Sequence, residues 1–255
     1  MALEWIMKIN RMLTASAVLL TLGSVASAQF ELTSRYSKVN YDYFAGFANQ
    51  SESVSDFLVE TTLDVTDSTA LVGSEDSSGF YVPSGTAWSA NGSWNISHQY
   101  SLIGSAASAT KLTASGSSTV SITSSNATAQ VASSLPGSEF SIEIALNSAQ
   151  QVRFMGSHTA DGPLNQTTGN TFGYFWNGST WQIFLVKQVN TNWDDLLNLG
   201  AGTYRFETFS IAQANQNATK SSSWEYSIEA VPEPGTMIAL GIGALAVAAR
   251  KRNKN

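Results

Sequence analysis

Apolar and polar side chains alternate along many short stretches of this 255-residue chain. An alternation with a period of two residues indicates a β-strand that buries one face and exposes the other. The clearest alternating positions are Trp94, Ile96, His98, Tyr100 and Leu102, then Val120 and Ile122, then Phe140, Ile142, Ile144 and Leu146, and finally Trp224, Tyr226 and Ile228. Further strands are predicted over 57–65, 151–155, 171–176, 181–189 and 204–211. The chain is therefore constrained to fold mainly into sheets.

Turn sequences separate these stretches. The clearest are Asn91-Gly92, Pro136-Gly137-Ser138, Asp161-Gly162-Pro163 and Asn177-Gly178. Residues 172–189 are interpreted as a hairpin, because an Asn-Gly pair supplies the positive φ angles of a tight turn. Short strands separated by such turns predict an all-β fold, an antiparallel β-sandwich or jelly roll, over residues 29–230.

One internal stretch, 191–200, instead predicts one or two turns of helix. Asp194 and Asp195 would lie in the first turn, where acidic groups are favoured, and Gly200 would end it. Two stretches rich in small residues, 104–109 and 113–129, are interpreted as polar strands with Ser/Thr-rich loops.

Charge and cysteine content exclude several classes of function. Residues 29–230 contain 7 Lys plus Arg against 17 Asp plus Glu, a net charge of −10. Neutralising phosphates needs clustered basic residues, so nucleic acid is excluded as a partner. The absence of cysteine excludes disulfides, thiolate zinc sites and a cysteine nucleophile. The sequence has no cofactor-binding or metal-ligand motif, and we expect neither a cofactor nor a metal.

The N-terminus has the three parts of a secretory signal peptide, over residues 1–28. Lys8 and Arg11 precede an apolar stretch, and Ala26-Ser27-Ala28 has the form of a small-residue cleavage site. Cleavage after Ala28 would leave Gln29 as the first mature residue. The alternative is a permanent N-terminal anchor helix, and both Met1 and Met7 are candidate starts.

The C-terminus also has three parts in a fixed order. Val231-Pro232-Glu233-Pro234 is predicted to be extended and exposed, because the prolines fix φ and remove two backbone donors. An apolar run follows, which includes Met237, Ile238, Leu240, Ile242, Leu245, Val247 and Ala249. The apolar run is followed by the basic residues Arg250, Lys251 and Arg252. Their positive charge predicts a cytoplasmic C-terminus.

The apolar run is short for a transmembrane helix. Residues 235–249 would form about 22 Å of helix at about 1.5 Å per residue, against a hydrocarbon core about 30 Å thick. Spanning therefore requires a thinned bilayer and basic side chains that reach back to the interface. An ordinary single-span anchor and a buried core helix are the alternatives.

These three parts, over residues 231–255, resemble the PEP-CTERM protein-sorting signal of Gram-negative bacteria. The resemblance implies that the segment holds the protein in the inner membrane, at least transiently. There an exosortase, an integral-membrane enzyme that resembles cysteine transpeptidases, would process it near the motif. The resemblance also implies a final location at the cell surface or in an extracellular, exopolysaccharide-rich biofilm.

Few residues of the body suggest catalysis. Ser157, His158 and Asp161 contain the residue types of a triad, but neighbours in sequence rarely have triad geometry, and no G-x-S-x-G motif is present. The acidic residues Asp64, Asp67, Glu75 and Asp76 offer the oxygen ligands that calcium prefers. Three carboxylate pairs have the residue types of a glycoside hydrolase. They are Asp64 with Asp67, Glu75 with Asp76, and Asp194 with Asp195. Each has a simpler interpretation as a solvated turn or helix start, so we expect no catalytic residue.

Tryptophans are numerous for a polar exported domain. Trp88, Trp94, Trp176 and Trp181 are candidates for stacking on sugar rings, although burial in the core is the simpler interpretation of any one of them. The resemblance to proteins with PEP-CTERM signals implies an exported structural or adhesive protein that is not an enzyme. The alternatives are a carbohydrate-binding module that uses exposed aromatic residues and, less favoured, a glycoside hydrolase.

Overall fold

The structure is a computed structural model that describes residues 28–48, 50–64, 66–81, 84–133, 139–162 and 167–232. The chain divides into two compact units, of which Gln29–Ala230 is the body. The other unit takes in residues 1–28 and 231–255, nearly all of which lie outside the described residues. The predicted signal helix and C-terminal hydrophobic helix lie outside the described residues, as do the predicted turn at 136–138 and Pro163.

All regular structure in the described residues is β-strand. The strands are β1 (Glu31–Phe47), β2 (Gln50–Glu60), β3 (Thr66–Tyr81), β4 (Thr86–Ser105), β5 (Ser108–Ser125), β6 (Thr128–Ser133), β7 (Glu139–Leu146), β8 (Gln150–Ala160), β9 (Thr167–Trp176), β10 (Trp181–Gln188), β11 (Thr191–Leu199), β12 (Gly202–Asn215) and β13 (Ala218–Val231). The prediction of an all-β body is confirmed.

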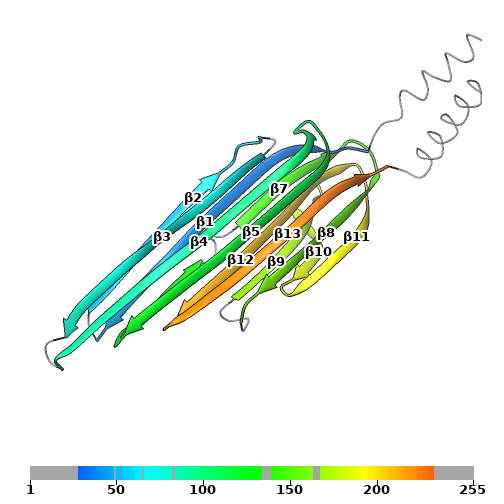
Figure 1. The fold of residues 1–255 in the computed structure, drawn as a ribbon. Coiled ribbons are helices and arrows are strands. Elements are labelled where there is room, and N and C mark those ends of the chain that lie inside the picture. Colours follow the sequence, from blue (N-terminus) through cyan, green and yellow to red (C-terminus); the bar gives the residue numbers. More distant parts are fainter. Residues whose placement is uncertain are drawn as a thin grey trace, which may run out of the picture. The chain divides into compact units, whose positions relative to one another are not determined.

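The strands form two sheets (Figure 1). Sheet 1 has the order β10-β9-β12-β6-β1-β2, and β7 also pairs with both β1 and β12. Sheet 2 has the order β11-β8-β13-β5-β4-β3. Neighbouring strands with a resolved register are antiparallel, and β4, with 20 residues, is much longer than the usual strand of about five or six residues.

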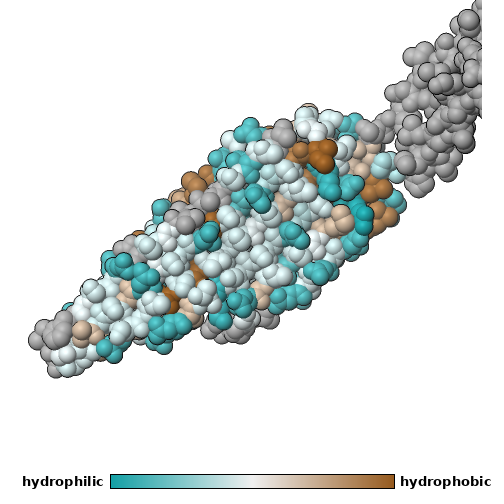
Figure 2. Space-filling view, viewed as in Figure 1, coloured by the Kyte–Doolittle hydropathy of each residue, from teal (hydrophilic) through white to brown (hydrophobic). Residues whose placement is uncertain are grey.

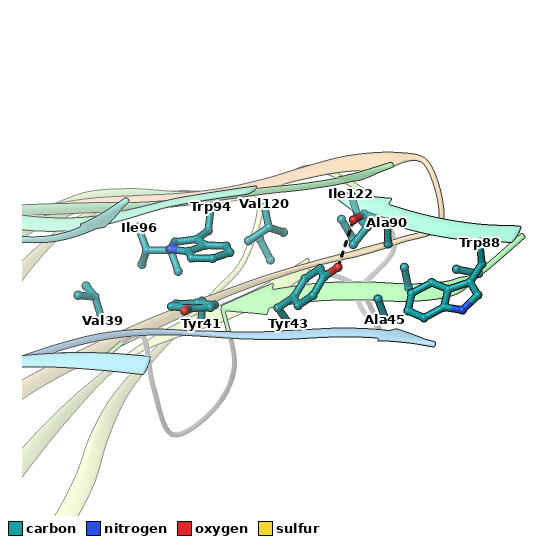
Figure 3. Packing of buried hydrophobic residues seen from close by; sticks show 14 residues of the cluster. Val39, Tyr41, Tyr43, Ala45, Trp88, Ala90, Trp94, Ile96, Val120 and Ile122 are labelled. Atoms are coloured by element: carbon teal, nitrogen blue, oxygen red, sulfur yellow. Dashed lines mark hydrogen bonds between the residues drawn. The ribbon is translucent and has the colours of Figure 1, made fainter. Parts of the chain in front are cut away.

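Inward side chains of the two sheets pack against each other and form the core of a β-sandwich. The Tyr41 ring of sheet 1 stacks on the Trp94 ring of sheet 2, with ring centres 3.6 Å apart and planes 13° from parallel (Figure 3). Phe140 of sheet 1 similarly contacts Trp224 of sheet 2, with ring centres 5.4 Å apart. The alternating positions seen in the sequence are thus the ones that hold the two sheets together.

The Asn91-Gly92 pair does not form the predicted turn, because it lies inside β4. Gly92 points into the core, where a Cβ atom would come within 2.5 Å of the Tyr43 ring. The Tyr43 hydroxyl also donates a hydrogen bond to the Ala90 carbonyl at 3.4 Å (Figure 3). Gly92 is therefore required by the close approach of an aromatic ring from the other sheet.

The hairpin predicted over 172–189 is confirmed. β9 and β10 pair antiparallel, and Gly178 in the connecting turn has a φ of 96°. The side-chain oxygen of Asn177 accepts hydrogen bonds from the backbone nitrogens of Ser179 and Thr180, at 3.0 and 2.9 Å. The Asn-Gly pair thus supplies both the left-handed backbone and its own side-chain support.

The helix predicted over 191–200 is wrong, since these residues form β11, which pairs with β8 along its whole length. Trp193, Asp195, Leu197 and Leu199 are its less exposed positions, so the period is two. In the sequence this period of two is interrupted, because the charged Asp195 occupies one of the inward positions. Its carboxylate lies 2.5 Å from Lys187 Nζ of β10, and this ion pair explains why a charged residue occupies an inward position.

Buried polar groups interrupt the apolar core near His98. Ser37 Oγ and His98 Nδ1 are 3.0 Å apart, and both side chains are buried. The nearby Arg35 is also buried, binds Asp67 Oδ2 at 2.5 Å and lies over the Tyr100 ring. Burial, with a smaller contribution from Arg35, lowers the pKa of His98 from 6.5 to about 3. His98 is therefore a neutral structural residue.

The core packing predicts different effects for the loss of a buried tryptophan and of an exposed one. Trp94→Ala removes the ring that bridges the sheets and should lower the free energy of unfolding by about 3–5 kcal/mol. Trp176→Ala, at a position 37% exposed, should change it by less than about 1 kcal/mol. Urea unfolding followed by circular dichroism measures both, and equal losses would contradict the placement of Trp94 in the core.

The pKa of His98 predicts how stability depends on pH. Between pH 3 and about 6.5 the unfolded histidine binds a proton that the folded one does not, so stability falls as pH falls. From pH 7 to pH 5 this residue should account for a loss of about 2 kcal/mol. His98→Gln keeps a hydrogen-bonding partner for Ser37 and should remove that part of the loss. Urea titrations at both pH values test this, and identical pH slopes in the two proteins would refute it.

Candidate functional site

The outer face of sheet 1 carries an unusual concentration of aromatic side chains. On β9, Thr171 and Gly173 point inward and are buried, while Phe172, Tyr174 and Trp176 alternate with them and remain at least partly exposed. Successive residues of a strand point to opposite faces, so these three rings share the outer face. From Phe172 to Trp176 the row is about 13 Å long, at about 3.3 Å per residue.

Neighbouring strands extend this row sideways. Trp181 of β10 is in register with Trp176, and the ring centres are 5.3 Å apart. On the other side of β9, Phe209 of β12 stacks on Phe172 with ring centres 6.2 Å apart. We name this group the aromatic face, consisting of Phe172, Tyr174, Trp176, Trp181 and Phe209.

An ion pair fixes the position of Arg205 at the edge of the aromatic face. The Arg205 Nε and Nη2 atoms donate hydrogen bonds to Glu143 Oε1 at 3.0 and 2.5 Å. The guanidinium carbon also lies 4.3 Å from the centre of the Trp181 ring, a cation–π contact. Arg205 thus holds Trp181 in place, and Glu143 balances its charge.

Two further carboxyl groups lie on the same outer face. Glu207 is in register with Phe172 and with Ser141, and Glu139 is in register with Phe209. Neither carboxyl group makes a hydrogen bond or an ion pair to any residue that the structure describes. Burial raises the pKa of both above the ordinary value, and the charge of Glu207 raises the pKa of Glu139 further.

The structure separates the four tryptophans predicted to stack on sugars. Trp176 and Trp181 lie on the aromatic face. The prediction is wrong for Trp88 and Trp94, which are only 6% exposed and point between the sheets. Both are inward positions of β4, as Figure 3 shows, and a sugar could reach them only if the sandwich opened.

Sequence reasoning missed the other members of the site. The sequence pattern places Phe172, Tyr174 and Phe209 in strands without indicating which face they share, and it does not distinguish Glu207 or Arg205 from other polar residues. A signal is present, because Phe172 and Tyr174 alternate with the small residues Thr171 and Gly173. Large residues that alternate with small ones would have indicated that the outer face carries the rings.

The triad suggested by the residue types of Ser157, His158 and Asp161 is absent. Ser157 and His158 are consecutive in β8 and point to opposite faces. Ser157 Oγ donates to Glu225 at 3.3 Å, whereas the buried His158 Nε2 lies 3.1 Å from the Phe209 carbonyl of sheet 1. Burial lowers the pKa of His158, so this ring is also a neutral core residue.

The carboxylates of one pair proposed from sequence, Asp194 and Asp195, do not converge either. Asp194 binds Arg153 and Asp195 binds Lys187, from opposite faces of β11. Asp67 binds Arg35. Nowhere in the described ranges do three or more His, Asp or Glu side chains gather as metal ligands would.

The outer face of sheet 2 has a different chemistry. Figure 2 shows a largely pale, weakly polar surface where β4, β5 and β13 face the viewer. Hydroxyl groups pair across these strands, for example Ser101 with Thr113 at 2.7 Å and Ser121 with Thr219 at 2.8 Å. A shallow hollow of about 1140 Å³ lies here. Its aromatic residues Tyr100, Trp193 and Tyr226 are buried, so they offer no ring face to a ligand.

The residues of the two predicted processing sites are described only in part. Gln29 lies at the start of the body, where its backbone oxygen accepts a hydrogen bond from Gln150 Nε2 at 3.0 Å. Val231 ends β13, and Pro232 follows it. Ala26, Glu233, Pro234, the apolar run from Met237 to Ala249, and the basic residues Arg250, Lys251 and Arg252 lie outside the described residues. No helix in the described part of the chain is long and apolar enough to cross a membrane.

Comparison with known proteins identifies the C-terminal segment. The body is an antiparallel β-sandwich with an aromatic outer face. Residues 230–252 match the model of the PEP-CTERM protein-sorting motif. The chain therefore carries the sorting signal that its sequence resembled, which marks it as an exported protein processed by an exosortase-type membrane enzyme.

Comparisons of the body are less informative. No curated protein matches the chain. Among solved structures, one described as TmCBM61 in complex with β-1,4-galactotriose is 10% identical, covers 64% of this chain and 88% of that one, and has a TM-score of 0.23. Structures of the Gx and Gt strains of infectious bursal disease virus are 9% and 10% identical. Each match covers 89% of this chain and 90% of the viral chain, with a TM-score of 0.19. TM-scores this low do not indicate a shared fold.

Proposed function

We propose that this chain is a non-catalytic adhesive or structural protein of the cell surface or of an exopolysaccharide biofilm matrix. Its body holds polysaccharide on the aromatic face. The observation that carries this proposal is the pair of the exposed Trp176 and the partly exposed Trp181, beside Tyr174 on one face of one sheet. The sorting motif supports the location, because it directs an exported protein toward the outside of the cell.

The chemistry of the aromatic face suits sugar rings. One side of a pyranose ring presents C–H bonds with a slight positive charge, and the face of an aromatic ring is negative. Rings arranged in a row along β9 allow several sugar units of one chain to stack. Arg205 can donate hydrogen bonds to sugar hydroxyl groups and Glu207 can accept them, and such bonds to charged groups are stronger than neutral ones.

A glycoside hydrolase is the second candidate, because Glu139 and Glu207 lie on the same face and have raised pKa values. A hydrolase needs a protonated carboxyl group on one side of the scissile bond and a carboxylate on the other. The two glutamates instead project from the same open side of a sheet, which favours binding. Release of reducing ends from a bound polysaccharide would overturn the non-catalytic part of the proposal.

Removal of either tryptophan ring of the aromatic face should weaken binding without unfolding the protein. In calorimetric titrations with polysaccharide secreted by the host, Trp176→Ala and Trp181→Ala should each weaken binding by more than about fivefold, as expected for aromatic residues at the centre of an interface. Ile103→Ser, at an apolar position of sheet 2 that is 61% exposed, is the matched control and should bind normally. Unchanged binding by both tryptophan variants would refute the site.

We also propose that the mature body corresponds to the described sandwich. Phe30 and Ala109 exchange two backbone hydrogen bonds of 2.8 Å, just after the predicted cleavage at Ala28. The last strand, β13, ends at Val231, just before Pro232 of the motif. Cleavage after Ala28 and near residues 232–236 would therefore remove no strand of the body.

The mass of the protein recovered from its native host tests this processing. We expect a chain that begins at Gln29 and ends between residues 232 and 236, as determined by intact mass and terminal sequencing. A chain that still ends at Asn255 would mean that the C-terminal segment is a plain membrane anchor, and the matrix location would lose its main support.

A further inference from the structure

The aromatic face carries more negative than positive charge. Arg205 is already neutralised by Glu143 at 2.5 Å. Lys38 is the other cation of this face, and its Nζ lies 5.3 Å from the ring centre of Phe57 on β2, in a cation–π contact. Glu139 and Glu207 have no ion-pair partner within 4.0 Å in the described residues, although Arg205 acts on both at longer range and Lys38 acts on Glu139.

These two carboxyl groups lie where a polysaccharide on the rings would pass. Glu207 is one strand away from Phe172, in register, and Glu139 has the same relation to Phe209. Neighbouring strands are about 4.8 Å apart, so each carboxyl group is within reach of a sugar stacked on the adjacent ring. A hydroxyl group there donates a hydrogen bond to the carboxylate, whereas a carboxylate or sulfate group of the polymer is repelled.

We infer that Glu207 and Glu139 make the aromatic face selective for neutral polysaccharides and exclude polymers that carry carboxylate or sulfate groups. The inference rests on the proposed polysaccharide binding and adds the class of ligand. The acidic body, with its net charge of −10 over residues 29–230, acts in the same direction at longer range. The effect of Glu207 and Glu139 on binding can be separated by experiment from the effect of the net charge, because only these two carboxylates would touch the ligand.

Matched polymers test the selectivity. The purified protein is titrated calorimetrically with hydroxyethylcellulose, galactan and galactomannan, and with the derivative of each in which primary alcohols are oxidised to carboxylates. We expect the protein to bind at least one neutral polymer, and its oxidised form more weakly. Glu207→Gln and Glu139→Gln should each strengthen binding to the oxidised form by about threefold to fivefold, the usual effect of one charge near a surface.

The control variant Glu225→Gln changes the net charge equally on the outer face of sheet 2 and should leave the discrimination unchanged. Discrimination by the unmodified protein should also shrink in 1 M salt, where charges are screened beyond about 3 Å.

Three results would contradict the proposals, and each is distinct. Equal binding of neutral and oxidised polymers by the unmodified protein would overturn the inference and leave the polysaccharide site intact. An equal gain of oxidised-polymer binding in Glu225→Gln would overturn the role of Glu207 and Glu139, because net charge alone would then explain the selectivity. Failure to bind any of the neutral or oxidised polymers, or the polysaccharide of the host, would overturn the proposed function itself.

Discussion

The contact between the inward faces of the two sheets is the constraint on which the rest of the molecule depends. Tyr41 stacked on Trp94, and Phe140 against Trp224, join the inward faces of the two sheets, which also meet through the backbone hydrogen bonds of Phe30 with Ala109. Because side chains alternate along a strand, each inward ring fixes which neighbours point outward. The outer positions of sheet 1 are therefore determined by the core, and the aromatic face is held on a rigid support.

Much of this arrangement could be predicted from the period of the sequence, and the failures share one physical cause. Alternation shows which residues share a face, but not whether that face is buried. Trp94 and Trp176 look alike in sequence, yet one lies between the sheets and the other in solvent. The turn predicted at Gly92 and the helix predicted around Asp195 are wrong for a related reason. Each residue is required by a partner on another strand, which is the Tyr43 ring for Gly92 and Lys187 for Asp195.

The candidate site was predictable only in part, for the same reason. Trp176 and Trp181 could be nominated because an Asn-Gly turn places them opposite each other in one hairpin. Glu207 and Phe209 belong to β12, which joins that hairpin through pairing across a long stretch of chain. Such long-range pairing is set by the whole fold and leaves no local pattern in the sequence.

An exported protein with exposed rings must also avoid pairing at its sheet edges, and β10 carries two features that oppose it. Its register shifts between Ile183 and Leu185, which interrupts the regular edge, and Lys187 points inward to Asp195 of the other sheet. Bulges and inward charges are known means of preventing strands from adding to an edge. They matter here because Ile183 and Val186 are 57% and 49% exposed and flank the aromatic face. The bulge thus allows an apolar edge strand to present ligand-binding rings without offering a regular backbone ladder to a second copy.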